Sequence, residues 1–193
     1  YTNSFLSFFP TIEVILNVEA DHLDFFKDID DIRHSFKLFA EKLPEDGLLV
    51  INKDIKHSEY FTQALKCRVV TFGHEKDADY TANFISYDKF AHPSYTLFYK
   101  GEELAQVELG VTGEHNIYNS LAAIAVARSL DIPMEVILRG LKRFTGTDRR
   151  FQKKGSVNGF TIIDDYAHHP QEIAATIEAA KKYPHRKLWI VFQ

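Results

Sequence analysis

Residues 12–51 read IEVILNVEADHLDFFKDIDDIRHSFKLFAEKLPEDGLLVI, and this stretch decides the fold. It begins with a short apolar run at 12–17 that is rich in β-branched residues and predicts a buried strand. From Asp28, which can cap a helix, apolar residues recur at helical spacing until the turn at 44–47. Residues 48–51 predict a second buried strand. This order predicts a βαβ unit of an α/β fold, with ligands gathered at the carboxyl ends of parallel strands.

The rest of the chain continues this alternation of strand and helix patterns. Short strand patterns between 69 and 109, with a turn at Lys100 and Gly101, predict an antiparallel or mixed edge. Helical periodicity at 116–130 and 134–144 predicts two packed helices. Two glycines and several basic residues within 144–158 indicate a boundary, so we expect domains at 1–144 and 145–193. The last pattern, strand 160–164, a helix from Pro170 and strand 188–192, predicts a second βαβ unit.

Composition narrows the class of protein. Hydrophobic residues make up 45% and charged residues 26%, which is typical of a globular domain. A net charge of -4 argues against a general nucleic-acid binder. With a single cysteine, and no apolar run near the roughly 20 residues that span a bilayer, we expect a cytoplasmic protein without membrane insertion. The first residue is Tyr1 and the last residues read as a strand, so we expect a piece of a longer protein.

The first polar motif, N-x-E-x-D-H-x-D at 17–24, follows the first predicted strand. Its carboxylates and imidazole are able to share a divalent ion, and Mg²⁺ takes few protein ligands while keeping waters and phosphates. A solvated loop or a helix cap is the alternative, since acidic stretches often follow strands.

The second motif, G-E-H-N-I-Y-N at 113–119, opens an Ala-rich helical pattern. Asn116 and Asn119 stand three residues apart, so their amides share one helical face and suit the donors and acceptors of a flat heterocycle. Simple capping of the helix is the alternative.

The third motif, G-T-D-R-R-F at 146–151, places two guanidinium groups in the predicted linker. Arginine forks match phosphate oxygens, and a linker position lets them reach a ligand when domains close. Ordinary surface charge is the alternative. A carboxylate at Asp148 can pair with Arg149 and weaken its phosphate role, which puts more weight on Arg150 as a phosphate contact.

The fourth motif, D-D-Y-A-H-H-P at 164–170, lies between a predicted strand and a helix that starts with proline. An aspartate at this place can accept from ribose hydroxyls, and neighbouring histidines can orient an anionic or amine substrate. The histidines also suit capping and packing. Neither a G-x-x-x-x-G-K-[ST] loop nor G-x-G-x-x-G occurs in the 193 residues.

Together and in this order, the four motifs resemble those of the Mur ligases, over essentially the whole chain. The resemblance implies a three-domain enzyme, of which 1–144 is part of the central ATPase domain and 145–193 the beginning of a Rossmann-like C-terminal domain. The phosphate loop of the family would then lie upstream of Tyr1. The D-Y-A-H-H-P stretch is most similar to the branch that adds L-alanine.

The activity implied by the resemblance is ATP-dependent ligation of L-alanine to UDP-N-acetylmuramate through an acyl phosphate, with Mg²⁺. Without the phosphate loop we expect these residues to be inactive alone. A murein tripeptide recycling ligase acting on the same UDP-sugar and a noncatalytic nucleotide-binding module are the alternatives.

The resemblance also assigns roles to individual residues. His22 resembles a magnesium ligand of the family with a catalytic role, and Asp21 is a candidate for the same shell. The other roles implied are adenine binding by Asn116 and Asn119 with His115 adjacent, ATP-phosphate binding by the catalytic Arg150 with Arg149, ribose binding by Asp165, and positions near the incoming alanine for Tyr166, the catalytic His168 and His169.

Overall fold

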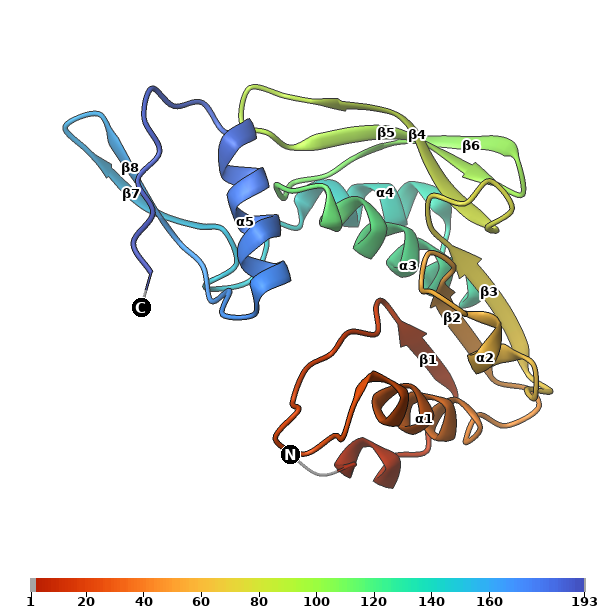
Figure 1. Cartoon of the computed structure of the whole chain (residues 1–193). Helices are drawn as coiled ribbons and strands as arrows, with labels where there is room; N and C mark the ends of the chain where they lie inside the picture. Colours follow the sequence, from red (N-terminus) through yellow and green to blue (C-terminus); the bar gives the residue numbers. More distant parts are fainter. Residues whose placement is uncertain (1–2, 193) are drawn as a thin grey trace.

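A computed structural model describes residues 3–192 and shows a six-stranded sheet followed by a two-stranded hairpin (Figure 1). The large sheet keeps the order of the sequence, parallel from β1 to β4 and antiparallel from β4 to β6. The predicted α/β class and the mixed edge are therefore confirmed. Its strands are β1 (Ile12–Ile15), β2 (Leu48–Asn52), β3 (Arg68–Phe72), β4 (Tyr80–Tyr87), β5 (Pro93–Tyr99) and β6 (Glu102–Glu108).

The predicted first βαβ unit is confirmed. Helix α1 (Ile29–Ala40) connects β1 to β2, which pair in parallel. The Asp28 carboxylate caps this helix by accepting the main-chain N–H of Asp30 at 3.1 Å and of Asp31 at 3.0 Å. The cap fixes where the helix starts, and so leaves 16–27 as a loop beyond the carboxyl end of β1.

Helices cover both faces of the parallel strands. Along β2, Leu48 and Val50 belong to the core shared with α3 (His115–Ser129) and α4 (Met134–Arg143). Their neighbours Leu49 and Ile51 belong to the core on the side of α1. This alternation follows from the two-residue period of a strand, and it explains why β2 is apolar from Leu48 to Ile51.

One short turn was predicted correctly, and two helices of four residues were not predicted. The turn at Lys100 and Gly101 is confirmed, with φ of 52° and 83°, as a two-residue hairpin between twisted strands requires. The 3₁₀ helix η1 (Ser4–Ser7) and helix α2 (Glu59–Thr62) were not predicted, because four residues are too few to show a helical period. In residues 3–192, no helix has the length and apolar character needed to cross a membrane.

The predicted second βαβ unit is wrong. Strand β8 (Phe160–Asp164) pairs antiparallel with β7 (Gln152–Val157), and residues 188–192 form no strand. The cause is the Asn158-Gly159 turn, whose φ angles of 49° and 82° suit the turn type that joins hairpin strands. The first strand of this hairpin, β7, falls within residues 144–158, which were interpreted as a linker. Helix α5 (Pro170–Lys182) is confirmed, while the domain boundary at 144/145 stays a prediction.

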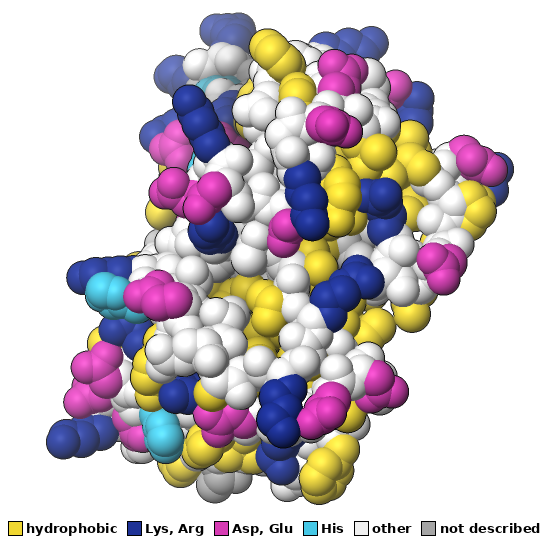
Figure 2. Space-filling model, turned by 90° about the vertical axis from the view of Figure 1, so that its right-hand side faces the viewer, with side chains coloured by type: hydrophobic (Ala, Val, Ile, Leu, Met, Phe, Trp, Pro, Cys, Tyr) yellow, Lys and Arg dark blue, Asp and Glu magenta, His cyan; other side chains and the backbone are white. Residues whose placement is uncertain are grey.

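Charged side chains of both signs are interspersed on the face of the molecule in Figure 2. Lysine and arginine lie among aspartate and glutamate, with hydrophobic side chains between them. No large field of one sign covers this face.

Candidate functional site

A groove of about 1370 Å³ lies between the large sheet and the second lobe, by which we mean 149–192 with β7, β8 and α5. Its walls come from the carboxyl ends of β1, β2 and β3, the start of α3, the 144–151 connection and α5. Parallel strands place their ends at one edge, so separate loops meet there. Five of the predicted site residues line the groove: His115, Asn116, Asn119, Arg150 and Asp165.

The asparagine pair shares one face of α3, as predicted. Asn116 Nδ2 donates to the Thr112 carbonyl oxygen at 2.7 Å, and Asn119 Nδ2 donates to Asn116 Oδ1 at 3.1 Å. These bonds hold the Asn116 amide in one orientation. Asn119 keeps its own carbonyl oxygen and a second N–H, so it offers one acceptor group and one donor to a planar ligand.

His115 joins the second motif to the third and fourth. The surrounding chain lowers the pKa of His115 by desolvation, while the Asp165 carboxylate raises it and the Arg150 guanidinium lowers it. The net direction keeps this imidazole neutral. Gly113 has φ of 97°, and a Cβ atom there would lie 2.5 Å from the His115 ring, so this position requires glycine.

Asp165 has a structural task as well as the predicted ribose contact. Its Oδ2 accepts the main-chain N–H of Phe151 at 2.7 Å, and its Oδ1 accepts that of Ala167 at 2.8 Å. The carboxylate thereby ties the end of β8 to the start of β7. Each carboxylate oxygen has a second lone pair, which remains for a ligand hydroxyl.

The two arginines of the third motif differ in their surroundings. Arg150 lines the groove and its Nη1 lies 3.4 Å from Glu172 Oε1. Arg149 is outside the lining, 3.7 Å from Asp164 and 4.7 Å above the Tyr166 ring. The expected pairing of Arg149 with Asp148 is wrong, because Asp148 accepts from Gln152 at 2.8 Å. Of the two arginines, only Arg150 is placed to face a ligand in the groove.

The residues predicted near the incoming alanine lie beside the groove rather than in its lining. His168 Nδ1 is 3.0 Å from the Tyr166 carbonyl oxygen, and the two side chains are largely exposed. His169 is the N-cap of α5, as the capping alternative has it, and reaches across to the first motif. Its Nδ1 lies 3.8 Å from Glu19 Oε2 and its Nε2 lies 3.4 Å from the Ala20 carbonyl oxygen. This histidine therefore connects the first and fourth motifs.

The predicted magnesium ligands lie on the exposed loop after β1. His22 has φ of 53° and its main-chain N–H donates to Asp21 Oδ1 at 2.7 Å, while its Nε2 lies 3.7 Å from Asp21 Oδ2. Over residues 3–192, no cluster of three or more His, Cys, Asp or Glu side chains is arranged to hold a metal ion. An imidazole and a carboxylate fit an ion whose remaining ligands are phosphates and water, so the assignment of Asp21 and His22 stays a prediction.

Among the groove residues that sequence reasoning missed are three whose side chains contact one another. Asp54 follows β2, His74 follows β3, and Tyr118 lies in the first turn of α3. Their side chains are hydrogen-bonded to one another. The only signal for Asp54 and His74 was their place just after a buried strand, because neither belongs to a motif.

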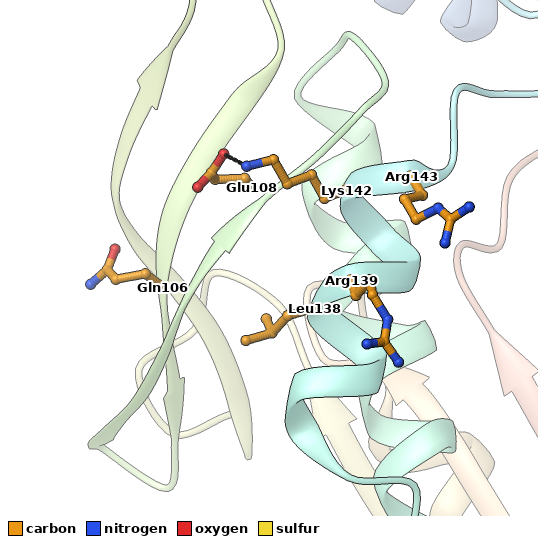
Figure 3. Close-up of a pocket in the computed structure, with 6 residues that line it drawn as sticks. All are labelled: Gln106, Glu108, Leu138, Arg139, Lys142 and Arg143. Carbon is orange, nitrogen blue, oxygen red and sulfur yellow. Dashed lines mark ion pairs between the residues drawn. The ribbon is translucent and has the colours of Figure 1, made fainter.

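A second hollow of about 320 Å³ between β6 and α4 carries a basic cluster (Figure 3). Lys142 points toward Glu108 and pairs with it at 2.7 Å, whereas Arg139 and Arg143 extend away from β6. This hollow is small and contains none of the motif residues, so the large groove is the candidate site.

Two domain families match consecutive parts of this chain. Residues 3–127 match the Mur ligase middle domain, and residues 149–193 match the Mur ligase, glutamate ligase domain. The chain belongs to the Mur ligase family. The groove thus lies between segments that match two domains of Mur ligases.

Individual Mur ligases show the same likeness along the whole chain. The UDP-N-acetylmuramate--L-alanine ligases of Lachnospira eligens and Agathobacter rectalis are 59% and 51% identical to it, over 100% of this chain and 42% of each relative. The crystal structure of the UDP-N-acetylmuramate-alanine ligase of Thermotoga maritima superposes with a TM-score of 0.79 at 28% identity, covering 94% of this chain and 40% of that one. The chain therefore spans less than half the length of these relatives.

Proposed function

We propose that the chain forms the nucleotide-facing part of a cytoplasmic ligase that joins L-alanine to UDP-N-acetylmuramate with ATP. The observation that carries the proposal is the meeting of three motifs in one groove: the Asn116–Asn119 pair, Arg150 and Asp165. An amide pair suits a base, a carboxylate suits a ribose and a guanidinium suits phosphates. A single groove thus offers a partner to each part of a nucleoside triphosphate.

The chemistry proposed is activation of a carboxylate as an acyl phosphate, followed by attack of the alanine amine, which forms the amide and releases phosphate. Phosphoryl transfer depends on positioning and on positive charge around the transferring group. Arg150 supplies that charge. Its Nη1 lies 3.4 Å from Glu172 Oε1, and the phosphates of a bound nucleotide would compete with Glu172 for the guanidinium group. Magnesium, held in part by His22 and Asp21, would neutralise further phosphate charge.

Closure of the groove is the second requirement, since water would hydrolyse an acyl phosphate. Several contacts already connect the first part of the chain with the second lobe. His169 lies 3.8 Å from Glu19, and Lys182 Nζ lies 3.0 Å from Glu114 Oε2. The fourth motif, which carries Tyr166 and His168 for the incoming alanine, is thereby held next to the first.

Of the two acceptors considered, we favour L-alanine over a murein tripeptide. The support is the D-D-Y-A-H-H-P sequence and the names of the relatives, two of which are alanine ligases that match the whole chain. Competition between free L-alanine and murein tripeptide in the assay below tests this choice.

Transplanting the 193 residues in place of the matching segment of the Lachnospira eligens ligase tests the proposal. We expect ADP release that depends on both UDP-N-acetylmuramate and L-alanine. Arg150→Ala in this chimera should reduce kcat by at least tenfold, because it removes charge from the phosphate region. Arg139→Ala, which lies on α4 outside the groove, is the matched control. A folded chimera that releases ADP only with tripeptide, or that is indifferent to Arg150→Ala, would overturn the proposal.

A further inference from the structure

Three polar side chains to which the motifs assigned no role meet at one wall of the groove. Asp54 and His74 follow adjacent parallel strands, β2 and β3, and Tyr118 belongs to α3. They form a chain of contacts from carboxylate to imidazole to phenol. Residues 20 and 44 positions apart in sequence are thereby joined at the end of the sheet.

The Asp54 carboxylate fixes the orientation of His74. It accepts the main-chain N–H of His74 at 2.9 Å and that of Glu75 at 3.2 Å, and it lies 2.8 Å from His74 Nδ1. The turn approaches so closely that a Cβ atom at Gly73 would lie 2.7 Å from Asp54 Oδ1. An ionised carboxylate only accepts, so the imidazole proton is assigned to Nδ1 and Nε2 carries a lone pair.

That lone pair faces the hydroxyl of Tyr118, which donates to it. The two rings are packed with centroids 4.1 Å apart. Burial and the carboxylates of Glu114 and Asp54 raise the pKa of Tyr118, so its hydroxyl keeps the proton that it donates. The whole connection therefore has one consistent direction, from phenol to imidazole to carboxylate.

We propose that Asp54, His74 and Tyr118 form a positioning relay for the nucleotide base, an inference that rests on the proposed function. Tyr118 lies between Asn116 and Asn119 in the first turn of α3. By holding Tyr118 against the end of β3, the relay sets the depth and rotation of the turn that presents the amide pair. Tyr118 and His74 act through these asparagines and are positioning residues.

Tyr118→Phe is the test, because it removes one hydroxyl and keeps the ring. Dissociation constants of the Lachnospira eligens chimera for ATP and for inorganic tripolyphosphate are measured by calorimetry. We expect the constant for ATP to rise about two- to tenfold, the usual effect of one lost hydrogen bond, and that for tripolyphosphate to stay unchanged. A residue that only stabilised the fold would affect both probes alike, or shift only the melting temperature.

His74→Phe completes the design as a second variant, since it keeps a flat ring that accepts no hydrogen bond. The double variant should lose no more ATP affinity than either single variant, because the two residues make one contact. Tyr60→Phe and His57→Asn, which lie outside the groove lining, are the matched controls and should bind both probes normally.

The outcomes separate the two proposals. If the unaltered chimera binds no ATP, the proposed function fails and the relay fails with it. If the unaltered chimera binds ATP and the variants keep the same ratio of ATP to tripolyphosphate affinity, the relay alone is overturned. Additive losses in the double variant would also overturn it.

Discussion

The large sheet and the second lobe have opposite distributions of apolar side chains. Around the sheet, Leu121 and Ile124 of α3 and Leu49 of β2 have no exposed surface. In the second lobe the buried hydrophobic residue is Ala179, while Ile162 is 54% exposed and Trp189 is 77% exposed. Burial of apolar surface is the main source of stability. The apolar core therefore lies around the large sheet, and the hairpin β7–β8 and helix α5 lie to one side of it (Figure 1).

The largest test of this difference is a pair of matched truncations. Leu121→Ala should lower the free energy of unfolding by about 2 to 5 kcal/mol, because it leaves a cavity between α3 and the sheet. Ile162→Ala on β8 should change it by less than about 0.5 kcal/mol, since that side chain is half exposed. Urea unfolding followed by circular dichroism measures both. Equal effects would contradict the contrast between the two parts.

The two parts of the molecule also differ in how they shift the pKa of a glutamate. Glu13 on β1 is 5% exposed and its carboxylate oxygens have no hydrogen-bond partner, so desolvation raises its pKa to about 7. Folding raises the pKa of Glu13, so the protein is most stable below about pH 4.5, where this carboxyl group is protonated in both states. Stability is lost as the pH rises to about 7 and the buried group must ionise. The loss should reach about 3 kcal/mol. Glu13→Gln should remove this part of the pH dependence, and unchanged curves from pH 4 to 8 would contradict the assignment.

The pKa of Glu172 in the second lobe is shifted in the opposite direction. Burial raises its pKa, but the main-chain N–H groups of His168 and His169 and the Arg150 charge outweigh burial and lower it. Its stabilisation is therefore present above its normal pKa and fades as the pH falls further. A titration of chemical shifts in Glu13→Gln and Glu172→Gln separates the two contributions.

Helix caps provide a smaller contrast. Asp28 accepts two main-chain N–H groups at the start of α1, and Asp28→Ala should lower the free energy of unfolding by about 1 kcal/mol. Asp46→Ala, in the turn after α1, is the control and should change it little. A smaller effect at Asp28 than at Asp46, measured by urea unfolding, would show that this cap does not hold the helix.

The smallest expected effect concerns the contact that holds the second lobe in place. Lys182 Nζ lies 2.9 Å from Tyr87 Oη and 3.0 Å from Glu114 Oε2, but the side chains are partly exposed. Lys182→Met should lower stability by less than about 1 kcal/mol while increasing proteolysis within 145–192. Lys181→Met is the control, because Lys181 pairs with Glu178 inside α5. Equal cleavage rates would show that this contact does not restrain the lobe.

Features that depend only on residues close in sequence were predicted correctly. The Asp28 cap, the Lys100-Gly101 turn and the shared face of Asn116 and Asn119 each depend on neighbours in sequence. The strand at 160–164 was also predicted correctly, but the same reasoning failed at 152–158, where glycine and lysine suggested a linker. The Asn158-Gly159 pair was the available hairpin signal, and it carries more information than the composition around it.

The sequence by itself determined the α/β class, the first βαβ unit and the family, because apolar periodicity and ordered motifs are written in the chain. Only the tertiary structure decided which predicted residues share the groove, and that Asp54, His74 and Tyr118 meet there. The physical reason is that parallel strands bring their ends to one edge whatever their separation in sequence. Contacts between distant loops therefore leave no local pattern.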